Sequence, residues 1–359
     1  MKPVLFVTGH APAYRVAAFA QLHEREDVEY ALFGGRLAHG GGATADELPF
    51  PHRHVHEHEL FALAASGRYR AVVASTGGRI ALPGSWAGAR RARVPLILWA
   101  SLWAHPRSAA HALSYPALLR LYRSADAIVT YGPHVSAYVR ARGARRVHVA
   151  PQAVDNAFWS SPEASIPSDP RWPAGAAVKF LFAGRPAREK GLRVLEEAWS
   201  MSGLQAPTAA LVLVGAGSTP PWVPAGGAVA RFMQVSQAEL RNFYEASDVL
   251  VVPSIPTRTF REPWGLVTNE AMNRGLPVIA SDAVGAAAGG LVQDGQNGLV
   301  VPAGDAVALA AALRQLARDP DRRARLGAAG REDVAAYTRE AWAEGFSRAL
   351  ADLGQSGGR

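Results

Sequence analysis

The sequence has 359 residues, of which 49% are apolar, so the chain is long enough for two α/β domains of ordinary size with buried cores. Its formal net charge of +8 comes almost entirely from arginines scattered along the chain, which is compatible with a phosphorylated substrate, an anionic membrane surface or nucleic acid. The absence of cysteine excludes disulfide bonds, thiolate metal sites and a cysteine nucleophile.

The apolar runs of the sequence bear on where the protein works. The first run, 4–7, is too short for a signal peptide, and no apolar stretch reaches the ~20 residues that span a bilayer. We therefore expect a cytoplasmic protein, with a basic surface compatible with peripheral contact with the cytoplasmic face of the inner membrane. No aromatic-interleaved basic motif or helix-turn-helix pattern accompanies the charge, so we expect no nucleic-acid partner.

The first half alternates short apolar runs with helical patterns, which predicts a doubly wound parallel sheet. The expected strands are 4–7, 29–33, 71–74, 95–99, 127–130 and 146–149. A glycine-bearing loop follows the first strand at Gly9 and leads into a helix that carries Tyr14 and Arg15. Because open α/β sheets commonly bind ligands at such a loop, we expect a pocket at this edge of the sheet.

Two groups of histidines are candidate ligands or catalytic groups. His52, His54, His56 and His58 alternate and would share one face of an extended segment. No distant Cys or Asp completes a metal site, so a solvated face is the preferred interpretation and we predict no metal. His105 follows a strand and lies among aromatic residues, where it is either a packing histidine or a functional one.

The second half begins after a stretch rich in proline and serine, 156–177, which we interpret as a linker. The strands expected beyond it are 178–183, 210–214, 229–234, 249–252, 276–280 and 299–301. The first of them delivers Gly184-Arg185 and, five residues later, Lys190. A glycine there lets the backbone approach a ligand, and two cations at a strand end can clamp a diphosphate. The strand end at 229–234 offers Phe232 and Met233 as walls for a nucleotide base.

The most informative stretch holds two carboxylates, Glu262 and Glu270, with seven residues between them. Its pattern is strand, loop, helix, strand: Pro263 and Gly265 keep the loop from being helical, and the helix begins about there, with Glu270 expected on its second turn. A helix N-terminus suits a phosphate, and carboxylates accept from paired hydroxyls, so the stretch favours a nucleotide sugar as ligand. The alternative is that both are ordinary surface acids.

These motifs, in this order, resemble the group 1 glycosyltransferases, the retaining family 4 with the GT-B fold. The segments that carry the resemblance are 184–191, 253–254, 262–270, 275–281 and 294–299, with looser matches at 12–16, 151–155 and the closing residues Tyr337, Trp342 and Phe346. Val284-Gly285 stands where a glycine pair is common in this family. The resemblance implies two doubly wound, Rossmann-like parallel-sheet domains that face a central cleft. They would be an acceptor-binding domain at 1–155, a linker at 156–177, a donor-binding domain at 178–335 and a C-terminal helix at 336–359 that packs back on the first domain.

Carried over to this sequence, the resemblance assigns roles to particular residues. Arg185 and Lys190 would hold the donor diphosphate, Glu262 the transferred sugar and Glu270 the ribose hydroxyls. Backbone amides near Gly265, Leu266 and Val267 would complete the phosphate site. The loop with Gly9, Tyr14 and Arg15 would lie on the acceptor side, and His105 would lie near the donor sugar, with His111 as a rival.

The activity implied is sugar transfer from a UDP-, GDP-, ADP- or TDP-sugar to an acceptor hydroxyl, with retention of configuration and without a cofactor or metal. The acceptor would contain a sugar or be linked to a lipid, in the biosynthesis of a bacterial glycoconjugate, polysaccharide or glycosylated metabolite. The alternatives are a non-catalytic sugar-nucleotide-binding protein, a sugar-nucleotide epimerase and a phosphorylase.

Overall fold

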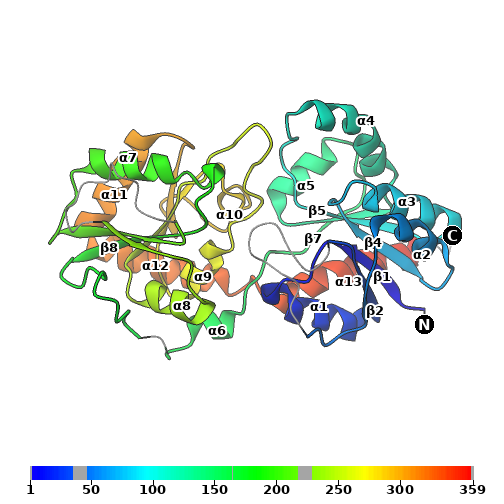
Figure 1. Ribbon diagram of the computed structural model, residues 1–359, viewed down its shortest axis with the longest axis horizontal. Coiled ribbons are helices and arrows are strands. Elements are labelled where there is room, and N and C mark those ends of the chain that lie inside the picture. The colour runs from blue at the N-terminus through cyan, green and yellow to red at the C-terminus, as the bar shows by residue number, and fades with distance from the viewer. Residues whose placement is uncertain (1, 35–46, 164, 217–228, 357–359) are drawn as a thin grey trace. The chain divides into compact units, whose positions relative to one another are not determined.

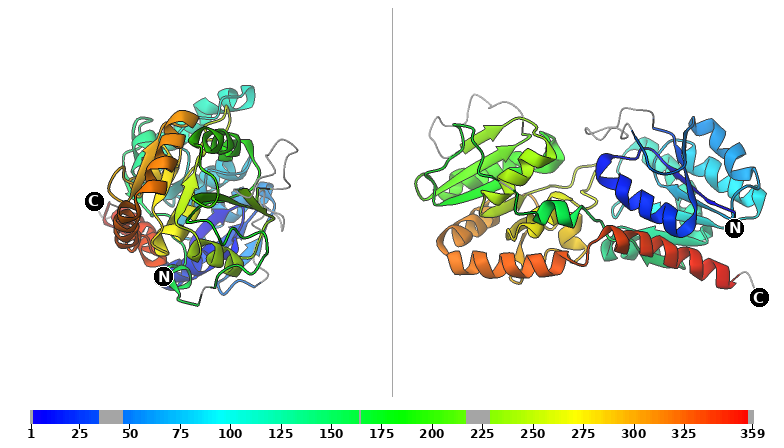
Figure 2. Two further views of the ribbon diagram at one scale, coloured as in Figure 1. Left: turned by 90° about the vertical axis from the view of Figure 1, so that its left-hand side faces the viewer. Right: turned by 90° about the horizontal axis from the view of Figure 1, so that it is seen from below.

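The computed structural model describes residues 2–34, 47–163, 165–216 and 229–356, and its contacts divide the chain into two compact units (Figure 1). The first unit is Met1–Ala153 together with Thr338–Arg359, and the second is Val154–Tyr337. Each unit is built around a parallel β-sheet with helices on both faces (Figures 1 and 2).

Within the described residues, the first unit holds a seven-stranded sheet in the order β3-β2-β1-β4-β5-β6-β7, in which every neighbouring pair is parallel. Apolar runs form its central strands because a parallel sheet is covered on both faces. The strands are β1 (Val4–Thr8), β2 (Val28–Leu32), β3 (His52–His54), β4 (Ala71–Ser75), β5 (Leu96–Ala100), β6 (Ala127–Thr130) and β7 (Val147–Val149).

Two apolar cores cover the two faces of the first sheet. Phe6 and Trp99 point into a core that includes Phe19 of α1 and Trp342 of α13, whereas Leu5 and Leu98 point into a core formed with α2, α3, α4 and α5. Alternate residues of one strand serve opposite faces, as the two-residue period requires. These helices are α1 (Ala13–Glu26), α2 (Leu60–Ala65), α3 (Ala81–Ala92), α4 (Ala109–Ser124), α5 (Pro133–Arg140) and α13 (Arg339–Ser356), and a 3₁₀ turn covers Glu57–Glu59.

The second unit holds a six-stranded parallel sheet in the order β10-β9-β8-β11-β12-β13, again among the described residues. Its core joins Phe180 and Leu211 of the sheet to Leu195 of α7 and Leu313 of α11. The strands are β8 (Val178–Ala183), β9 (Ala209–Val214), β10 (Val229–Phe232), β11 (Val249–Val252), β12 (Val278–Ser281) and β13 (Gly298–Val301). The helices are α6 (Asn156–Ser160), α7 (Leu192–Ser202), α8 (Gln237–Glu245), α9 (Val267–Asn273), α10 (Gly285–Ala288), α11 (Ala306–Arg318) and α12 (Pro320–Val334), and a 3₁₀ turn covers Arg188–Lys190.

The two doubly wound sheets confirm the expected fold, and each predicted strand overlaps an observed one. The extended segment with the alternating histidines contains β3 (His52–His54), which pairs with β2 at the edge of the first sheet. His52 and His54 of this strand are exposed, and so are His56, which follows it, and His58, which lies in the 3₁₀ turn Glu57–Glu59.

The segment 156–177, expected to be a linker, belongs to the second unit. Asp155 caps α6 by accepting a hydrogen bond from the Phe158 N–H, and the indole rings of Trp159 and Trp172 are buried against Tyr244 and Phe243. Two buried tryptophans thus fix a stretch whose proline and serine content is typical of a linker.

The C-terminal helix α13 belongs to the first unit, where it packs beside α1 and against β6 and β7 (Figure 2). Trp342 and Phe346 are fully buried there. The Trp342 ring lies 5.6 Å from the ring of Phe19 and 5.8 Å from that of Trp99. A segment at the end of the chain therefore completes the core at its beginning.

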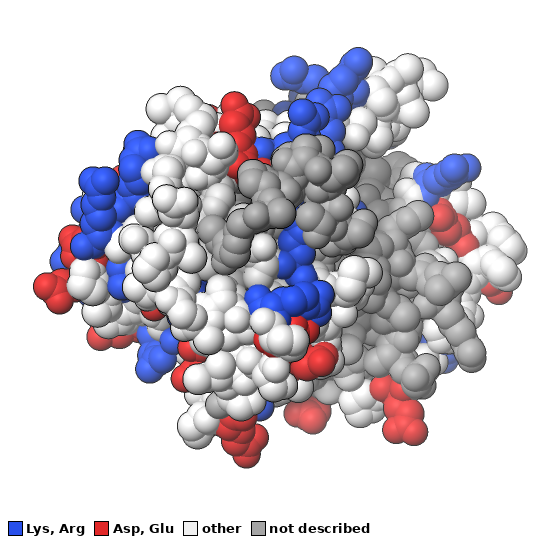
Figure 3. All heavy atoms as spheres, turned by 60° about the vertical axis from the view of Figure 1, so that its left-hand side comes forward, with Lys and Arg blue, Asp and Glu red and all other residues white. Residues whose placement is uncertain are grey.

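The surface shows how the basic charge is distributed. Over the described part of the face in Figure 3, Lys and Arg side chains form several separate groups interspersed with Asp and Glu. In the described parts of the chain, the structure has no helix with the length and apolar composition to cross a bilayer.

Candidate functional site

The loop that follows β8 carries the two predicted diphosphate ligands of the second unit. The Gly184 N–H donates to the Val214 carbonyl O at 3.0 Å, which ties the start of the loop to β9. Arg185 is about half exposed and donates to Glu189 Oε1 at 2.7 Å, one turn further on. Lys190 ends the 3₁₀ turn, so both cations lie at the carboxyl end of β8, where parallel sheets bind ligands.

A close backbone contact fixes this loop against the end of β11. Gly191 has φ +69°, and a Cβ atom at that position would lie 1.8 Å from the Pro253 carbonyl O. The Ile255 N–H donates to the Glu189 carbonyl O at 2.9 Å. The loop before α7 and the loop after β11 are therefore held together, and glycine is required at 191 by both its conformation and its packing.

Glu262 lies at the junction of these loops and forms an ion pair with Lys190. The Lys190 Nζ donates to Glu262 Oε2 at 2.6 Å, and Glu262 is only 7% exposed. Its backbone makes a parallel bridge with Val284, and a Cβ atom on Gly285 would meet the Pro263 carbonyl O at 1.9 Å. The neighbouring segment therefore holds the first of the two predicted carboxylates in place.

The second carboxylate, Glu270, lies in the first turn of α9, one turn earlier than predicted, because the helix begins at Val267. Gly265 has φ +89° and precedes the helix with Leu266 as its cap residue. The Glu270 N–H donates to the Leu266 carbonyl O at 3.1 Å. Gly265, Leu266, Val267 and Glu270 thus follow one another through the turn that leads from Glu262 into the helix.

The environment of Glu270 includes a residue that the sequence analysis missed. The Tyr244 hydroxyl, from α8, donates to Glu270 Oε2 at 2.8 Å. Burial raises the pKa of the Glu270 carboxyl to about 7, against the opposing effect of this hydrogen bond. Burial and the nearby carboxylate raise the pKa of Tyr244 well above its ordinary value. No local pattern indicated the pair, because 26 residues separate its members.

The predicted walls for the base differ from each other in exposure. Phe232 is 3% exposed and packs between the Phe243 ring, with centroids 4.7 Å apart, and the Arg171 guanidinium, 4.9 Å from its centroid. Met233 is 64% exposed. Only Met233 therefore presents a side chain to solvent at the end of β10, and the role of both residues stays a prediction.

The predicted acceptor-side residues lie in the first unit. Gly9 follows β1, and its carbonyl O accepts from the Gly34 N–H at 2.8 Å. Tyr14 and Arg15 lie in the first turn of α1, the helix that was expected to carry them. Tyr14 is 38% exposed, whereas Arg15 is 4% exposed, with its guanidinium against the ring of Trp99 and hydrogen-bonded to Gln152 Oε1 at 2.6 Å. The side chain of Arg15 is thus part of the packed interior.

The two rival histidines of the first unit are neighbours. His105 Nε2 donates to the His111 carbonyl O at 3.1 Å, which places a proton on Nε2. His111 Nδ1 lies 2.7 Å from Ser108 Oγ, the cap of α4. The His105 ring also packs against Tyr115, with centroids 4.4 Å apart. His105 therefore packs in one cluster with His111 and Tyr115, and a catalytic role for either histidine stays a prediction.

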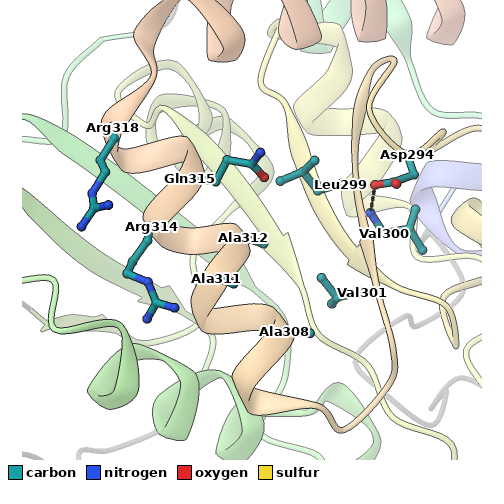
Figure 4. Close-up of a pocket in the computed structure, with 10 residues that line it drawn as sticks. All are labelled: Asp294, Leu299, Val300, Val301, Ala308, Ala311, Ala312, Arg314, Gln315 and Arg318. Carbon is teal, nitrogen blue, oxygen red and sulfur yellow. Dashed lines mark hydrogen bonds between the residues drawn. The ribbon is translucent and has the colours of Figure 1, made fainter.

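Elsewhere in the second unit the structure has an open groove, but it offers no cluster of metal ligands among the described residues. Among the described residues, no group of three or more His, Asp or Glu side chains could hold a metal ion. A wide groove of the second unit runs between α11 and the edge strand β13, lined by alanines of the helix with Arg314 and Arg318 at one side (Figure 4). It contains none of the predicted donor-site residues, so the cluster around Lys190, Glu262 and Glu270 is the better candidate.

Residues 177–319 match the family model described as "Glycosyl transferases group 1". This part of the chain is a group 1 glycosyltransferase domain. It covers the loop after β8, Glu262, Glu270 and Tyr244, so the candidate site lies inside the matched region. The match confirms the family resemblance seen in the sequence.

Curated relatives of the glycosyltransferase domain have related names. The chain is 35% identical over 227 residues to "D-inositol 3-phosphate glycosyltransferase" of Xylanimonas cellulosilytica, which is 57% of this chain and 50% of that protein. It is 36% identical over 186 residues to "Phosphatidyl-myo-inositol mannosyltransferase" of Mycobacterium leprae, which is 50% of this chain and 48% of that protein. The chain thus spans about half the length of the curated relatives it matches.

Solved structures extend the likeness to both units. HepE of Anabaena, crystallised with UDP and glucose, matches 98% of this chain and 100% of its own with a TM-score of 0.72 at 16% identity. Sucrose-phosphate synthase of Thermosynechococcus elongatus matches 99% and 100% with a TM-score of 0.69 at 22% identity. Together with the two parallel sheets, these neighbours show that the chain has the GT-B fold.

Proposed function

We propose that the protein is a glycosyltransferase that moves a sugar from a nucleoside-diphosphate sugar to an acceptor hydroxyl. The observation that carries the proposal is the arrangement after β8 and β11, in which Lys190 is paired with Glu262 and the turn that follows Glu262 leads into α9 with Glu270 in its first turn. Cations suit a diphosphate and carboxylates suit sugar hydroxyls, so one ligand that contains both fits the cluster.

In this proposal each residue of the cluster binds a different part of the donor. Arg185 and Lys190 bind the diphosphate, and the amides of Gly265, Leu266 and Val267 add backbone donors. Glu262 binds hydroxyls of the transferred sugar, and Glu270 binds those of the ribose. Gly184 allows the backbone to approach the donor, and Met233 with Phe232 borders the base.

The proposed reaction needs neither an enzymic nucleophile nor a metal. The bond between the anomeric carbon and the diphosphate oxygen breaks as the acceptor oxygen bonds to the same face of that carbon. A donor phosphate oxygen takes the acceptor proton, and configuration is retained. Arg185 and Lys190 stabilise the negative charge that develops on the leaving diphosphate, which is the largest single contribution expected of such a site. His105, with His111 as a rival, stays a candidate for a catalytic role.

The proposed acceptor is a sugar or polyol hydroxyl on a soluble or lipid-linked molecule. The names of the curated relatives, which include inositol phosphate and phosphatidylinositol, support a phosphorylated polyol as the first acceptor to test. Gly9, Tyr14 and Arg15 would lie on the acceptor side. We place the reaction in the cytoplasm or on the cytoplasmic face of the inner membrane, in the synthesis of a bacterial glycoconjugate, polysaccharide or glycosylated metabolite.

A nucleotide-binding panel tests the donor site directly. UDP, GDP, ADP and TDP, with their common sugars, are titrated into the wild type and Glu270→Ala, with melting temperature and calorimetric affinity as readouts. A donor stabilises the folded state by mass action, so one nucleotide should raise the melting temperature and lose that effect in the variant. Glu197→Ala removes an exposed carboxylate of α7 and should leave binding unchanged.

Transfer assays distinguish the proposal from its alternatives. The selected donor is incubated with inositol 3-phosphate or with vesicles that contain phosphatidylinositol, and the products are identified. Binding without transfer to any acceptor would favour a non-catalytic protein, and conversion of the donor without an acceptor would favour an epimerase. Absence of binding at millimolar concentrations of every nucleotide would refute the donor-site assignment.

A further inference from the structure

Tyr244 connects the helix before β11 to the carboxylate of α9. Its hydroxyl donates to Glu270 Oε2 at 2.8 Å, and its side chain has no exposed surface. Among the described residues, it is the one hydrogen-bond partner of the Glu270 carboxylate. Glu270 itself is partly exposed. A fully buried hydroxyl therefore holds one carboxylate oxygen of a residue that is itself only partly buried.

The packing around Tyr244 leaves its ring little freedom. The Trp159 ring of α6 meets it at 79°, with centroids 5.6 Å apart, in an edge-to-face contact. The same indole anchors α6, and α6 packs directly against α9. Three helices, α6, α8 and α9, thus converge on the hydrogen bond. A tyrosine held this firmly can fix the rotamer of a carboxylate. Any other rotamer of Glu270 would break the hydrogen bond and leave the buried Tyr244 hydroxyl without an acceptor.

We propose that Tyr244 is a positioning residue for the donor, which holds Glu270 so that its second oxygen accepts hydrogen bonds from the ribose. This inference rests on the proposed function and refines its substrate class. A carboxylate fixed in one orientation can accept from two adjacent hydroxyls, so it favours a ribonucleotide donor. A 2′-deoxyribonucleotide lacks one of those hydroxyls and leaves part of the carboxylate unsatisfied.

The test compares each nucleotide with its 2′-deoxy form. Binding of UDP, GDP and ADP and of dUDP, dGDP and dADP is measured by calorimetry for the wild type and Tyr244→Phe. We expect the wild type to prefer its ribonucleotide roughly tenfold over the deoxy form, as the loss of one charge-assisted hydrogen bond predicts. In Tyr244→Phe the ribonucleotide should bind roughly tenfold more weakly and the preference should largely disappear. The donor KM of transfer should rise while kcat changes little.

Tyr30→Phe is the matched control. Tyr30 is also fully buried, and its hydroxyl donates to the Phe19 carbonyl O at 2.8 Å in the first unit. The variant loses a comparable buried hydrogen bond, so its melting temperature should fall by a similar amount while nucleotide affinity stays at the wild-type value.

A second background separates positioning from a general loss of structure. In Glu270→Ala, adding Tyr244→Phe should cause no further loss of affinity, because Tyr244 acts through Glu270. An equal further loss would overturn the inference. If Tyr244→Phe does not fold, Glu270→Asp replaces it in the test. Aspartate keeps the negative charge but is too short to keep the hydrogen bond to Tyr244. Wild-type nucleotide affinity in Glu270→Asp would overturn the inference. Wild-type protein that binds no nucleotide would refute the proposed function and this inference with it. Normal ribose preference in a folded Tyr244→Phe would refute only the inference.

Discussion

The ion pair between Lys190 and Glu262 places a cation and a carboxylate within one hydrogen bond of each other in a mostly buried position. The side chain of Lys190 is 23% exposed and that of Glu262 is 9% exposed. An ammonium group has three donors on a flexible stem, so it can keep Glu262 and still offer a proton to a phosphate oxygen. This pair therefore links the proposed diphosphate site to the proposed sugar site at the level of single atoms.

Replacing Lys190 should weaken donor binding far more than replacing another partly buried lysine. Lys190→Met removes a charge-assisted hydrogen bond to the diphosphate, so the dissociation constant should rise roughly 10- to 100-fold. Lys179→Met is the control, because the Lys179 ammonium donates to the Ala176 carbonyl O away from the site. Calorimetric titration with the nucleotide selected by the panel measures both. Equal losses in the two variants would contradict the role of Lys190.

Donor affinity should also depend on pH through Glu270. The ribose hydroxyls donate to the ionised carboxylate, and burial raises the pKa of Glu270 to about 7. Below pH 7 the Glu270 carboxyl must lose a proton before it can accept from the ribose, so donor affinity should be about tenfold weaker at pH 6 than at pH 8.

The raised pKa of Glu270 also affects folding. The folded state holds the proton of this carboxyl more tightly than the unfolded state does, so the free energy of unfolding should fall as pH rises from about 4.5 to about 7. Titrations of Glu270→Gln supply the control, which should lack this part of the pH dependence.

The sequence could predict how Glu262 and Glu270 lie relative to each other, because both belong to one short stretch of the chain. Glu262 and Glu270 flank one loop and one helix turn, so their spacing could be interpreted directly. The sequence did not predict the hydrogen bond between Tyr244 and Glu270, because a strand and a loop separate the two residues. A buried tyrosine in an amphipathic helix has the same sequence pattern as a residue of the apolar core. Trp159 and Trp172 pack the segment that was expected to be a linker against the second unit. The proline and serine content of that segment does not predict this packing.

At the scale of elements, the site depends on how closely two loops approach each other. The loop after β8 meets the end of β11 at Gly191, where the Pro253 carbonyl O occupies the space a side chain would need. The neighbouring Lys190 and Glu262 come from these same two loops, so their hydrogen bond depends on the approach. A larger residue at 191 would separate the loops and with them the charged pair.

A pair of glycines tests this argument. Gly191 and Gly203 have φ values of +69° and +68°, but a Cβ atom on Gly203 would meet nothing within 4 Å. Gly203→Ala should therefore lower the free energy of unfolding by about 1 kcal/mol, the cost of a left-handed conformation alone. Gly191→Ala should cost about 2 kcal/mol more because of the overlap with Pro253, and should also weaken nucleotide binding. Chemical denaturation and calorimetry of the two variants measure the difference. Equal costs would contradict the close approach.

At the scale of the whole molecule, the two units have separate cores. The proposed donor residues from Gly184 to Glu270 all rest on the core of the second unit, which joins α7 and α11 to its sheet. The core of the first unit depends on α13, whose Trp342 is fully buried among Trp99, Phe19 and Phe346. Because stability is local to such cores, damage to one should leave nucleotide binding by the other in place.

Hydrogen exchange of two tryptophan variants examines this independence. Trp342→Ala removes a large side chain from the first core and should destabilise that unit by about 3 to 5 kcal/mol, which speeds exchange in β1, β5 and α1. Addition of the selected nucleotide should still slow exchange at 184–191 and 262–272, as in the wild type. Trp199→Ala acts on α7 of the second unit, directly after the Lys190 loop, and should reduce the protection that the nucleotide gives. If Trp342→Ala abolished that protection while exchange in the second unit was otherwise unchanged, donor binding would require an intact first unit, and the second unit alone could not account for the donor site.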